Sequence, residues 1–326
     1  MTKFKVYVTD YDNPDVNIER DILTKEVDAE ILELHTRDPK ILMQKLKDAD
    51  AILTQYAPMN REIISSLKKC QVIARYGIGY DNVDVESCTE NGIIVLNVPS
   101  YCEEEVSDSV IAMSYALTKK LNFYHKNLLK EIWDWKPGVP IHRFDKLKAG
   151  LLGFGNISKF AAKKFKALGL EVMVNDPFIS DEIFEEHGVK KVTFDKLIKE
   201  SDILSIHVPL TPKTKHLLGK KEFDLMKNTA IIINTSRGAI IDENALINAL
   251  HEKSIAAAGL DVFENEPVSK DNPLLSMDNV IATPHCGWYS EESKIEIRKK
   301  IATNVLKVLK GEEPYGFVNK KELGRV

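Results

Sequence analysis

Residues 149–178 read AGLLGFGNISKFAAKKFKALGLEVMVNDPF, and they carry the clearest indication of a fold in the sequence. An apolar run leads into Gly153-Phe154-Gly155, a segment of helical periodicity follows, and a second apolar run ends in Asp176. Gly153 suits a tight turn, and Gly155 lets the backbone and the helix N-terminus approach a pyrophosphate. The stretch therefore predicts the strand, turn and helix of a dinucleotide-binding fold.

Asp176 lies 23 positions after Gly153, where a carboxylate accepts hydrogen bonds from the ribose hydroxyls of a dinucleotide. An acid at this place repels a 2′-phosphate, so we expect NAD and not NADP as the cofactor. Ser158 replaces the third glycine of the pattern, which indicates slightly looser packing of the helix on the strand. A Gly-x-Gly turn on its own is weak support, because such turns also join strands to helices that bind nothing.

Apolar runs alternate with helical patterns on both sides of this stretch, as a parallel α/β architecture requires. From the turn onward, six runs predict a complete dinucleotide-fold sheet: Gly150–Gly153, Glu171–Asn175, Ile203–His207, Ala230–Asn234, Ala256–Leu260 and Val280–Thr283. Before it, five runs predict a smaller doubly wound sheet: Phe4–Val8, Ala29–Leu34, Ala51–Leu53, Val72–Ala74 and Ile93–Asn97. The helices expected between the five runs are Pro39–Lys47, Arg61–Lys68 and Val85–Glu90.

Two longer helical patterns divide the chain into domains. Glu103–Asn127 predicts one long helix connecting the domains, and Ser290–Leu309 predicts a helix that returns to the smaller domain. We therefore expect a Rossmann NAD-binding domain at 100–289, inserted into a flavodoxin-like substrate-binding domain made of 1–99 and 290–326. A length of 326 residues agrees with two domains.

Composition narrows the class of protein further. Hydrophobic residues at 44% and charged residues at 29% exclude a disordered chain, and a net charge of −4 disfavours nucleic-acid or anionic-membrane binding. The start MTKFKVYVTDYDN lacks a signal-peptide pattern, and no run of apolar residues is long enough to cross a membrane. The four cysteines are scattered and suggest neither disulfides nor a metal site. We expect a cytoplasmic enzyme without a bound metal.

Three segments place charged or titratable residues just after predicted strands, at the edge where ligands bind in open α/β sheets. IIINTSRGAIID carries Arg237, AAGLDVFENEP carries Asp261, Glu264 and Glu266, and IATPHCGW carries His285. Each of them alone has an ordinary explanation as a surface ion pair, a loop cap or a core histidine. At successive strand ends in one domain they together indicate a catalytic site.

These motifs make the sequence resemble the D-isomer-specific 2-hydroxyacid dehydrogenases over nearly its whole length. The resemblance rests on RYGIGYDNVD, NVP, LGFGNIS with Asp176, HVPLTPKT, NTSRGAIID, GLDVFENEP and TPHCGW. Within the family, RYGIGYDN and TPHCGWYSEE are most similar to the branch of the C-terminal-binding proteins, whose bacterial relatives are phosphoglycerate-dehydrogenase-like.

The resemblance implies Arg237, Glu266 and His285 as the catalytic trio. His285 would exchange a proton with the substrate oxygen, Glu266 would stabilise its imidazolium, and Arg237 would hold the carboxylate or carbonyl oxygen. Asp261 would accept a hydrogen bond from the nicotinamide carboxamide. The implied cofactor-binding residues are Gly153, Phe154, Gly155, Asn156, Ile157, Asp176, His207, Val208, Pro209, Thr214, Thr235, Ser236, Arg237, Asp261, His285 and Gly287. The implied substrate-binding residues are Arg75, Tyr76, Gly77, Ile78, Gly79, Arg237 and Trp288, with backbone N–H groups of the turn at 76–79 binding the carboxylate.

The sequence thus predicts an NAD-dependent oxidoreductase that interconverts a small D-2-hydroxy acid and its 2-oxo acid. The resemblance also implies a homodimer built on the long helix and the Trp-containing loop after it. Two alternatives stay open. One is an NADH-sensing scaffold with vestigial activity, and the other is a D-3-phosphoglycerate dehydrogenase, whose substrate needs extra cations such as Arg61, Arg75 or Arg143. The side chain of the acid and the physiological direction do not follow from the sequence.

Overall fold

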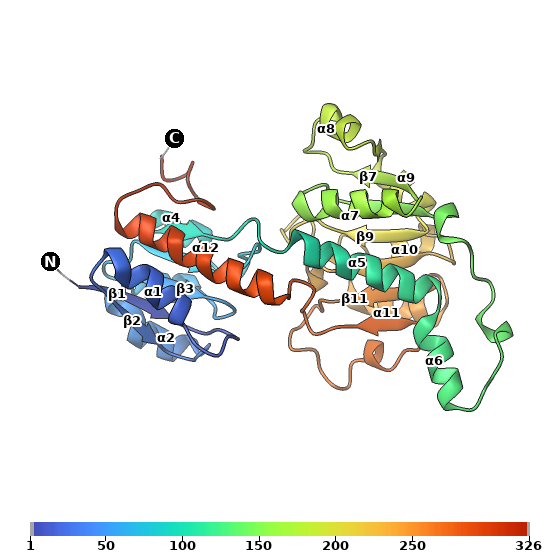
Figure 1. Ribbon diagram of the computed structural model, residues 1–326, viewed down its shortest axis with the longest axis horizontal. Coiled ribbons are helices and arrows are strands. Elements are labelled where there is room, and N and C mark those ends of the chain that lie inside the picture. The colour runs from blue at the N-terminus through green and yellow to red at the C-terminus, as the bar shows by residue number, and fades with distance from the viewer. Residues whose placement is uncertain (1–2, 325–326) are drawn as a thin grey trace. The chain divides into compact units, whose positions relative to one another are not determined.

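The computed structural model describes residues 3–324, which form two compact units (Figure 1). The first unit contains the chain up to Tyr101 and again from Ser290 onward, and the second contains Cys102–Tyr289. Residues 1–2 and 325–326, which the sequence analysis assigns to the substrate-binding domain, lie outside the described residues. Each unit has one sheet in which all paired strands are parallel, and this confirms the predicted fold class.

The sheet of the first unit has the strand order β2-β1-β3-β4-β5. Its strands are β1 (Phe4–Val8), β2 (Ala29–Glu33), β3 (Ala51–Thr54), β4 (Val72–Arg75) and β5 (Ile94–Leu96). The five predicted runs lie within two residues of these bounds. The order reverses between β1 and β3, and it is at the carboxyl ends of such a pair of strands that open α/β sheets bind ligands.

The α-helices of the described residues that accompany this sheet are α1 (Asn17–Glu26), α2 (Pro39–Lys45), α3 (Arg61–Ser65), α4 (Val85–Glu90) and α12 (Glu291–Leu309). The sequence analysis did not predict α1, because the helix is mostly polar and Val16 gives it no side-chain cap. The spacing of Ile18 and Ile22 was the available signal. Ser290 caps α12, which packs against α1 within this unit (Figure 1).

The sheet of the second unit has the strand order β12-β11-β10-β9-β6-β7-β8. Its strands are β6 (Lys148–Leu152), β7 (Glu171–Asn175), β8 (Lys190–Lys191), β9 (Ile203–Ile206), β10 (Ile231–Asn234), β11 (Ala257–Leu260) and β12 (Val280–Ala282). All six predicted strands are present. The prediction of six was nevertheless incomplete, because β8 is an edge strand of two exposed lysines with no apolar signal.

Seven helices belong to this unit: α5 (Glu103–Thr118), α6 (Leu121–Leu129), α7 (Asn156–Ala167), α8 (Asp181–Glu186), α9 (Phe194–Glu200), α10 (Lys220–Leu225) and α11 (Glu243–His251). The single helix predicted over Glu103–Asn127 was wrong, because Lys120 adopts a left-handed φ of 54° and separates α5 from α6. Within this unit α5 lies along α7 (Figure 1). Among the described residues, no helix has both the length and the apolar character that a membrane span needs.

Candidate active site

The turn after β6 lies against the loop after β9, at the point where the strand order of the second unit reverses. Gly153 has a φ of 95°, and a Cβ there would lie 3.0 Å from the carbonyl carbon of His207 and the nitrogen of Val208. Gly153 also donates its N–H to the carbonyl of Asn175 at 2.9 Å. Glycine is required here by both the conformation and the close approach. This is the crevice in which doubly wound sheets bind dinucleotides.

The start of α7 has the form that a pyrophosphate needs. Gly155 precedes the helix, no side chain in the described part of the chain caps it, and a Cβ at Gly155 would meet no atom within 4 Å. The N-terminus of α7, beginning at Asn156 and Ile157, is therefore open to an anion. Ser158, which replaces the third glycine of the pattern, is buried and donates its hydroxyl to the carbonyl of Gly153 at 2.7 Å. Its hydroxyl therefore has a hydrogen-bond partner inside the turn.

Asp176 lies at the carboxyl end of β7, as predicted, and its carboxylate is held by backbone. Oδ2 accepts from the N–H of Phe154 at 2.8 Å, and Oδ1 accepts from the N–H of Phe178 at 2.9 Å. Each oxygen keeps a further lone pair for a ribose hydroxyl. Phe154 itself offers less than expected, because its ring is fully buried and packs on Phe184. Only the backbone of Phe154 is left to contact a cofactor.

The loops after β9 and β10 are tied to each other. The hydroxyl of Ser236, after β10, donates to the carbonyl of Val208, after β9, at 2.6 Å. Within the loop after β9, the hydroxyl of Thr214 donates to the carbonyl of Pro209 at 2.6 Å. The hydroxyl of Thr235 is buried and has no hydrogen-bond partner among residues 3–324. An unpaired buried hydroxyl is costly, and one beside this crevice fits a site that binds a polar ligand.

His207 is the first residue after β9, at the same edge of the sheet, and its side chain is uncharged at neutral pH. Burial lowers the pKa of His207 to about 4, so the imidazole is uncharged at neutral pH. Its Nε2 lies 2.9 Å from the hydroxyl oxygen of Ser205. A neutral imidazole adds no charge that would repel the nicotinamide end of an oxidised dinucleotide.

Arg237 is presented by a loop that its neighbours shape. Asn234, fully buried at the end of β10, accepts from the N–H of Ser236 at 3.0 Å and donates to the carbonyl of Arg237 at 2.9 Å. At Gly238 a Cβ would lie 1.9 Å from the carbonyl carbon of Phe263, so only glycine permits this contact. The loop bearing Arg237 therefore touches the loop after β11, which bears Glu266.

Glu266 and His285 form a hydrogen-bonded pair. Nδ1 of His285 lies 2.7 Å from Oε2 of Glu266, while Oε1 accepts from the N–H of Phe263 at 3.0 Å. Burial acts to raise the pKa of Glu266, but the hydrogen bond and charge of His285, the N–H of Phe263 and the charge of Arg237 outweigh it. The pKa of Glu266 is therefore below its usual value, and the trio implied by the motifs lies together in this unit.

Asp261 supports the segment that carries His285. Its buried carboxylate accepts from the Thr283 hydroxyl at 2.6 Å and from the N–H groups of Cys286 at 2.9 Å and Gly287 at 2.8 Å. These bonds hold His285 at a left-handed φ of 52°, a conformation that a non-glycine residue adopts only under constraint. Three of its four lone-pair positions are thus used, which leaves Asp261 a smaller part in cofactor binding than expected.

In the first unit, the turn at 76–79 follows β4. The phenol of Tyr76 is buried and donates to Glu19 at 3.1 Å, and the N–H of Tyr76 donates to the carbonyl of Thr54 at 2.9 Å. Tyr76 is therefore structural. Within the described chain, the N–H groups of Gly77, Ile78 and Gly79 donate to no protein group, and Gly77 has a φ of 141°. Adjacent N–H groups without a protein acceptor are able to bind an anion.

The other implied substrate contacts take different positions. Nε of Arg75 donates to the carbonyl of Gln55 at 3.2 Å, and its guanidinium lies over Gly77, where it would clash with any Cβ. Trp288, in the second unit, donates its indole N–H to the carbonyl of His285 at 3.1 Å. Arg61 begins α3 and pairs with Glu90, so its charge is balanced by a carboxylate, and Arg143 precedes the amino end of β6.

Sequence reasoning assigned no role to two further groups. In the second unit, Nε2 of His216 lies 2.7 Å from Glu264, while Glu264 and Glu243 each accept the other's backbone N–H, which clamps the loop of Glu266 to α11. In the first unit, Asp10 follows β1 and binds the loop after β3. Its place at a strand end was the available signal. The described residues contain no cluster of three or more His, Cys, Asp or Glu side chains able to hold a metal ion.

One protein-family model matches most of the second unit. The family model described as the NAD binding domain of D-isomer specific 2-hydroxyacid dehydrogenase matches residues 111–287. The D-3-phosphoglycerate dehydrogenase of Methanocaldococcus jannaschii is 41% identical over 85% of this chain, which spans only 53% of that protein. A glyoxylate reductase of Thermococcus litoralis is 38% identical over 88% of this chain and 90% of its own length.

Solved structures agree with these relatives. D-lactate dehydrogenase from Aquifex aeolicus, complexed with NAD and lactic acid, matches with a TM-score of 0.86 and 29% identity over 94% of this chain and 96% of that one. An acyclic imino acid reductase in complex with NADPH and D-Arg matches with a TM-score of 0.87 and 26% identity, over 97% of this chain and all of that chain.

Proposed function

The chain belongs to the D-isomer-specific 2-hydroxyacid dehydrogenase family of NAD-dependent oxidoreductases, and from this premise we propose that it reduces a small 2-oxo acid to the D-2-hydroxy acid, and catalyses the reverse. The observation that carries the proposal is the pair of His285 and Glu266 beside the loop of Arg237, in the unit that contains the dinucleotide turn. The reaction needs a proton donor, a permanent cation and a cofactor crevice, and the residues of this unit supply all three.

Each residue has a distinct task in the reduction. NADH, when bound, supplies a hydride to the carbonyl carbon of the acid. His285 donates a proton to the carbonyl oxygen from Nε2, because Nδ1 is held by Glu266. Glu266 stabilises the imidazolium before the transfer, and Arg237 attracts the negative charge that develops on the oxygen. The products are the hydroxy acid, NAD⁺ and a neutral His285, which regains a proton from solvent.

The cofactor would be held by residues of the second unit alone. The N-terminus of α7 after Gly155 binds the pyrophosphate, and Asp176 accepts from the ribose hydroxyls. The carboxylate of Asp176 favours NADH over NADPH, since a 2′-phosphate beside it would be repelled. Thr235 gains a partner for its buried hydroxyl when the polar cofactor or substrate is present.

The substrate carboxylate would be bound in the first unit by the N–H groups of Gly77, Ile78 and Gly79, which have no protein acceptor in the described part of the chain. We further propose that a second copy of the chain covers α6 and the loop after it. Their exposed apolar side chains include Leu129 at 73%, Trp133 at 90% and Trp135 at 67% exposure. A homodimer would shield them. Cytoplasmic location stays a prediction of the sequence.

A substrate panel tests the proposal. Purified protein is mixed with NADH and each of a series of 2-oxo acids, and NADH oxidation is followed with the chirality of the product. We expect turnover of at least one acid with a D product. An absence of turnover with every acid, combined with partner binding that depends on NADH, would contradict the proposal and support a sensing scaffold. An L product would also contradict it.

A further inference from the structure

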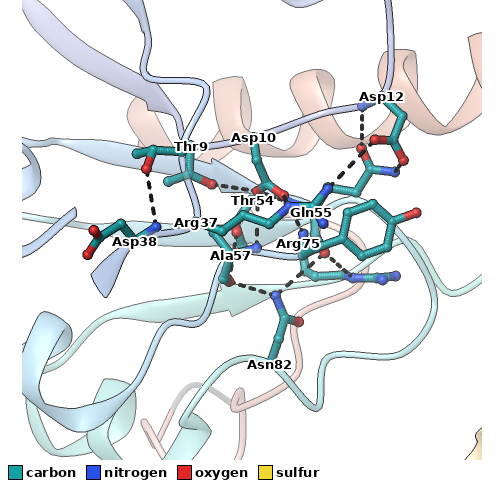
Figure 2. A network of polar contacts seen from close by, with 12 residues as sticks. Thr9, Asp10, Asp12, Arg37, Asp38, Thr54, Gln55, Ala57, Arg75 and Asn82 are labelled. Atoms are coloured by element: carbon teal, nitrogen blue, oxygen red, sulfur yellow. Dashed lines mark hydrogen bonds and ion pairs between the residues drawn. The ribbon is translucent and has the colours of Figure 1, made fainter. Parts of the chain in front are cut away.

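A carboxylate of the protein itself fills the ligand crevice of the smaller sheet. The order of this sheet reverses between β1 and β3, and Asp10 follows β1 at that point. The Asp10 carboxylate accepts three consecutive backbone N–H groups of the loop after β3: those of Gln55 at 3.1 Å, Tyr56 at 3.0 Å and Ala57 at 3.1 Å. Consecutive N–H groups converging on one anion are the arrangement by which loops bind phosphates. Here Asp10, only 4% exposed, occupies that position (Figure 2).

The guanidinium of Arg37 lies next to this position, and carboxylates of the protein balance its charge. Nε of Arg37 donates to Oδ2 of Asp10 at 2.9 Å, and another nitrogen of its guanidinium lies 3.7 Å from Asp12. The guanidinium also stacks 4.4 Å from the centre of the Tyr56 ring. Asp12 is fixed by Gln55, whose side chain both accepts from the N–H of Asp12 and donates to its carboxylate. Arg37 therefore faces two carboxylates.

This cluster adjoins the turn proposed to bind the substrate carboxylate. Arg75 donates to the carbonyl of Gln55 while its guanidinium lies over Gly77. Asn82 donates to the carbonyl of Ala57 at 2.9 Å, so the loop after β3 and the loop after β4 are joined (Figure 2). Two guanidiniums and two carboxylates thus share this edge, and their formal charges cancel. A second anionic group of a substrate at this edge would meet Asp10 and Asp12 and find no net positive charge.

We propose that Asp10 and Asp12 make the protein selective for 2-oxo acids whose only charge is the carboxylate, with an uncharged side chain, and against phosphorylated or dicarboxylic acids. The inference rests on the proposed function and narrows its substrate class. Asp10 acts by occupying the phosphate-type loop, and Asp12 acts by opposing the charge of Arg37. Arg61, the other arginine of this unit considered above, is engaged by Glu90 on α4 and does not restore a cation.

The test compares hydroxypyruvate with 3-phosphohydroxypyruvate, which differ only in the phosphate. We expect kcat/KM for hydroxypyruvate to be at least about tenfold higher, because a phosphate at this edge would lose its hydration without gaining a net positive charge and would lie beside two carboxylates. A higher value for the phosphorylated acid would overturn the inference while leaving the proposed function intact. If neither acid is turned over, calorimetric titration of both decides the matter, and tighter binding of the phosphorylated acid contradicts selectivity.

Asp12→Asn isolates the charge without disturbing the fold, since the Asp12 side chain is 55% exposed and asparagine keeps the shape. We expect this variant to lower the ratio of kcat/KM for hydroxypyruvate to kcat/KM for 3-phosphohydroxypyruvate by about threefold or more, because kcat/KM for the phosphorylated acid rises. Asp21→Asn is the matched control, because Asp21 is exposed on α1 and the change in net charge is the same. Equal ratios in the two variants would refute the role of Asp12.

Discussion

Nδ1 of His285 lies 2.7 Å from Oε2 of Glu266, and the two residues come from loops after different strands. The pair depends on backbone placement at both ends. Asp261 holds the His285 segment, and the absence of a side chain at Gly238 lets the Arg237 loop contact the Glu266 loop. The chemistry proposed for the protein follows from this arrangement because it fixes which ring nitrogen of His285 faces the substrate.

The pair makes stability depend on pH. The folded-state pKa of Glu266 is below the usual 4.5, so this group stabilises the fold above that pH and loses its contribution as the pH falls through the lowered value. Glu266→Gln should therefore lower Tm at pH 7, and the difference from the unsubstituted protein should shrink below pH 4.5. Thermal unfolding from pH 7 to 3 measures this. Glu185→Gln, at an exposed position on α8, is the control with a small difference at every pH.

Alanine substitutions at two glycines should change two different properties, cofactor binding in one case and stability of the fold in the other. A Cβ at Gly155 meets no atom within 4 Å, so Gly155→Ala should keep Tm unchanged and raise the KM for NADH by filling the pyrophosphate position. A Cβ at Gly238 meets the carbonyl carbon of Phe263 at 1.9 Å, so Gly238→Ala should cost about 1–3 kcal/mol or more of stability. Calorimetry and NADH titration check both. A stable Gly238→Ala enzyme of normal activity would contradict the close contact of the two loops.

Asp176 should decide the choice between the two nicotinamide cofactors. Asp176→Asn removes the negative charge and keeps an oxygen acceptor for one of the two N–H groups, those of Phe154 and Phe178, that the carboxylate oxygens now accept. We expect the kcat/KM ratio of NADPH to NADH to rise by about tenfold, since one unit of charge repulsion is lost. Steady-state kinetics with both cofactors measure the ratio. A native enzyme that already prefers NADPH would show that Asp176 has another role.

The exposed aromatic side chains of the loop after α6 should lie in a subunit contact. The double substitution Trp133→Ser with Trp135→Ser should convert a dimer to a monomer, because two large apolar side chains leave the covered surface. Sedimentation velocity gives the oligomeric state. Phe178→Ser removes an aromatic ring that is 91% exposed elsewhere in the second unit and should leave the dimer intact. A native protein that sediments as a monomer would exclude this contact.

Much of the site could be predicted because its signals are local. Gly153 and Asp176 belong to one continuous stretch of strand, turn, helix and second strand, and Arg237 and His285 each come shortly after an apolar run. Since parallel strands bring their carboxyl ends to one edge, separate motifs could be expected to meet without knowledge of their contacts.

The remainder depends on contacts between distant segments, which no local pattern encodes. The N–H groups that bind Asp10 belong to residues 45 to 47 positions away, so its role as an internal anion is invisible in the sequence. The bonds of Asp261 to residues 22 to 26 positions later, which hold the His285 segment, were likewise not predicted, and its contact with the nicotinamide stays a prediction. The break at Lys120 was missed because helical periodicity continues across a single left-handed residue.

In the proposed reaction His285 exchanges the proton during hydride transfer, and the variant His285→Gln removes that group. Turnover is measured with the best 2-oxo acid from the panel, and NADH binding is measured separately by fluorescence titration. We predict that kcat falls by about 10²–10⁴-fold, the usual contribution of a general acid, while the Kd for NADH stays within about twofold. Undiminished turnover in a variant that binds NADH normally would contradict the claim.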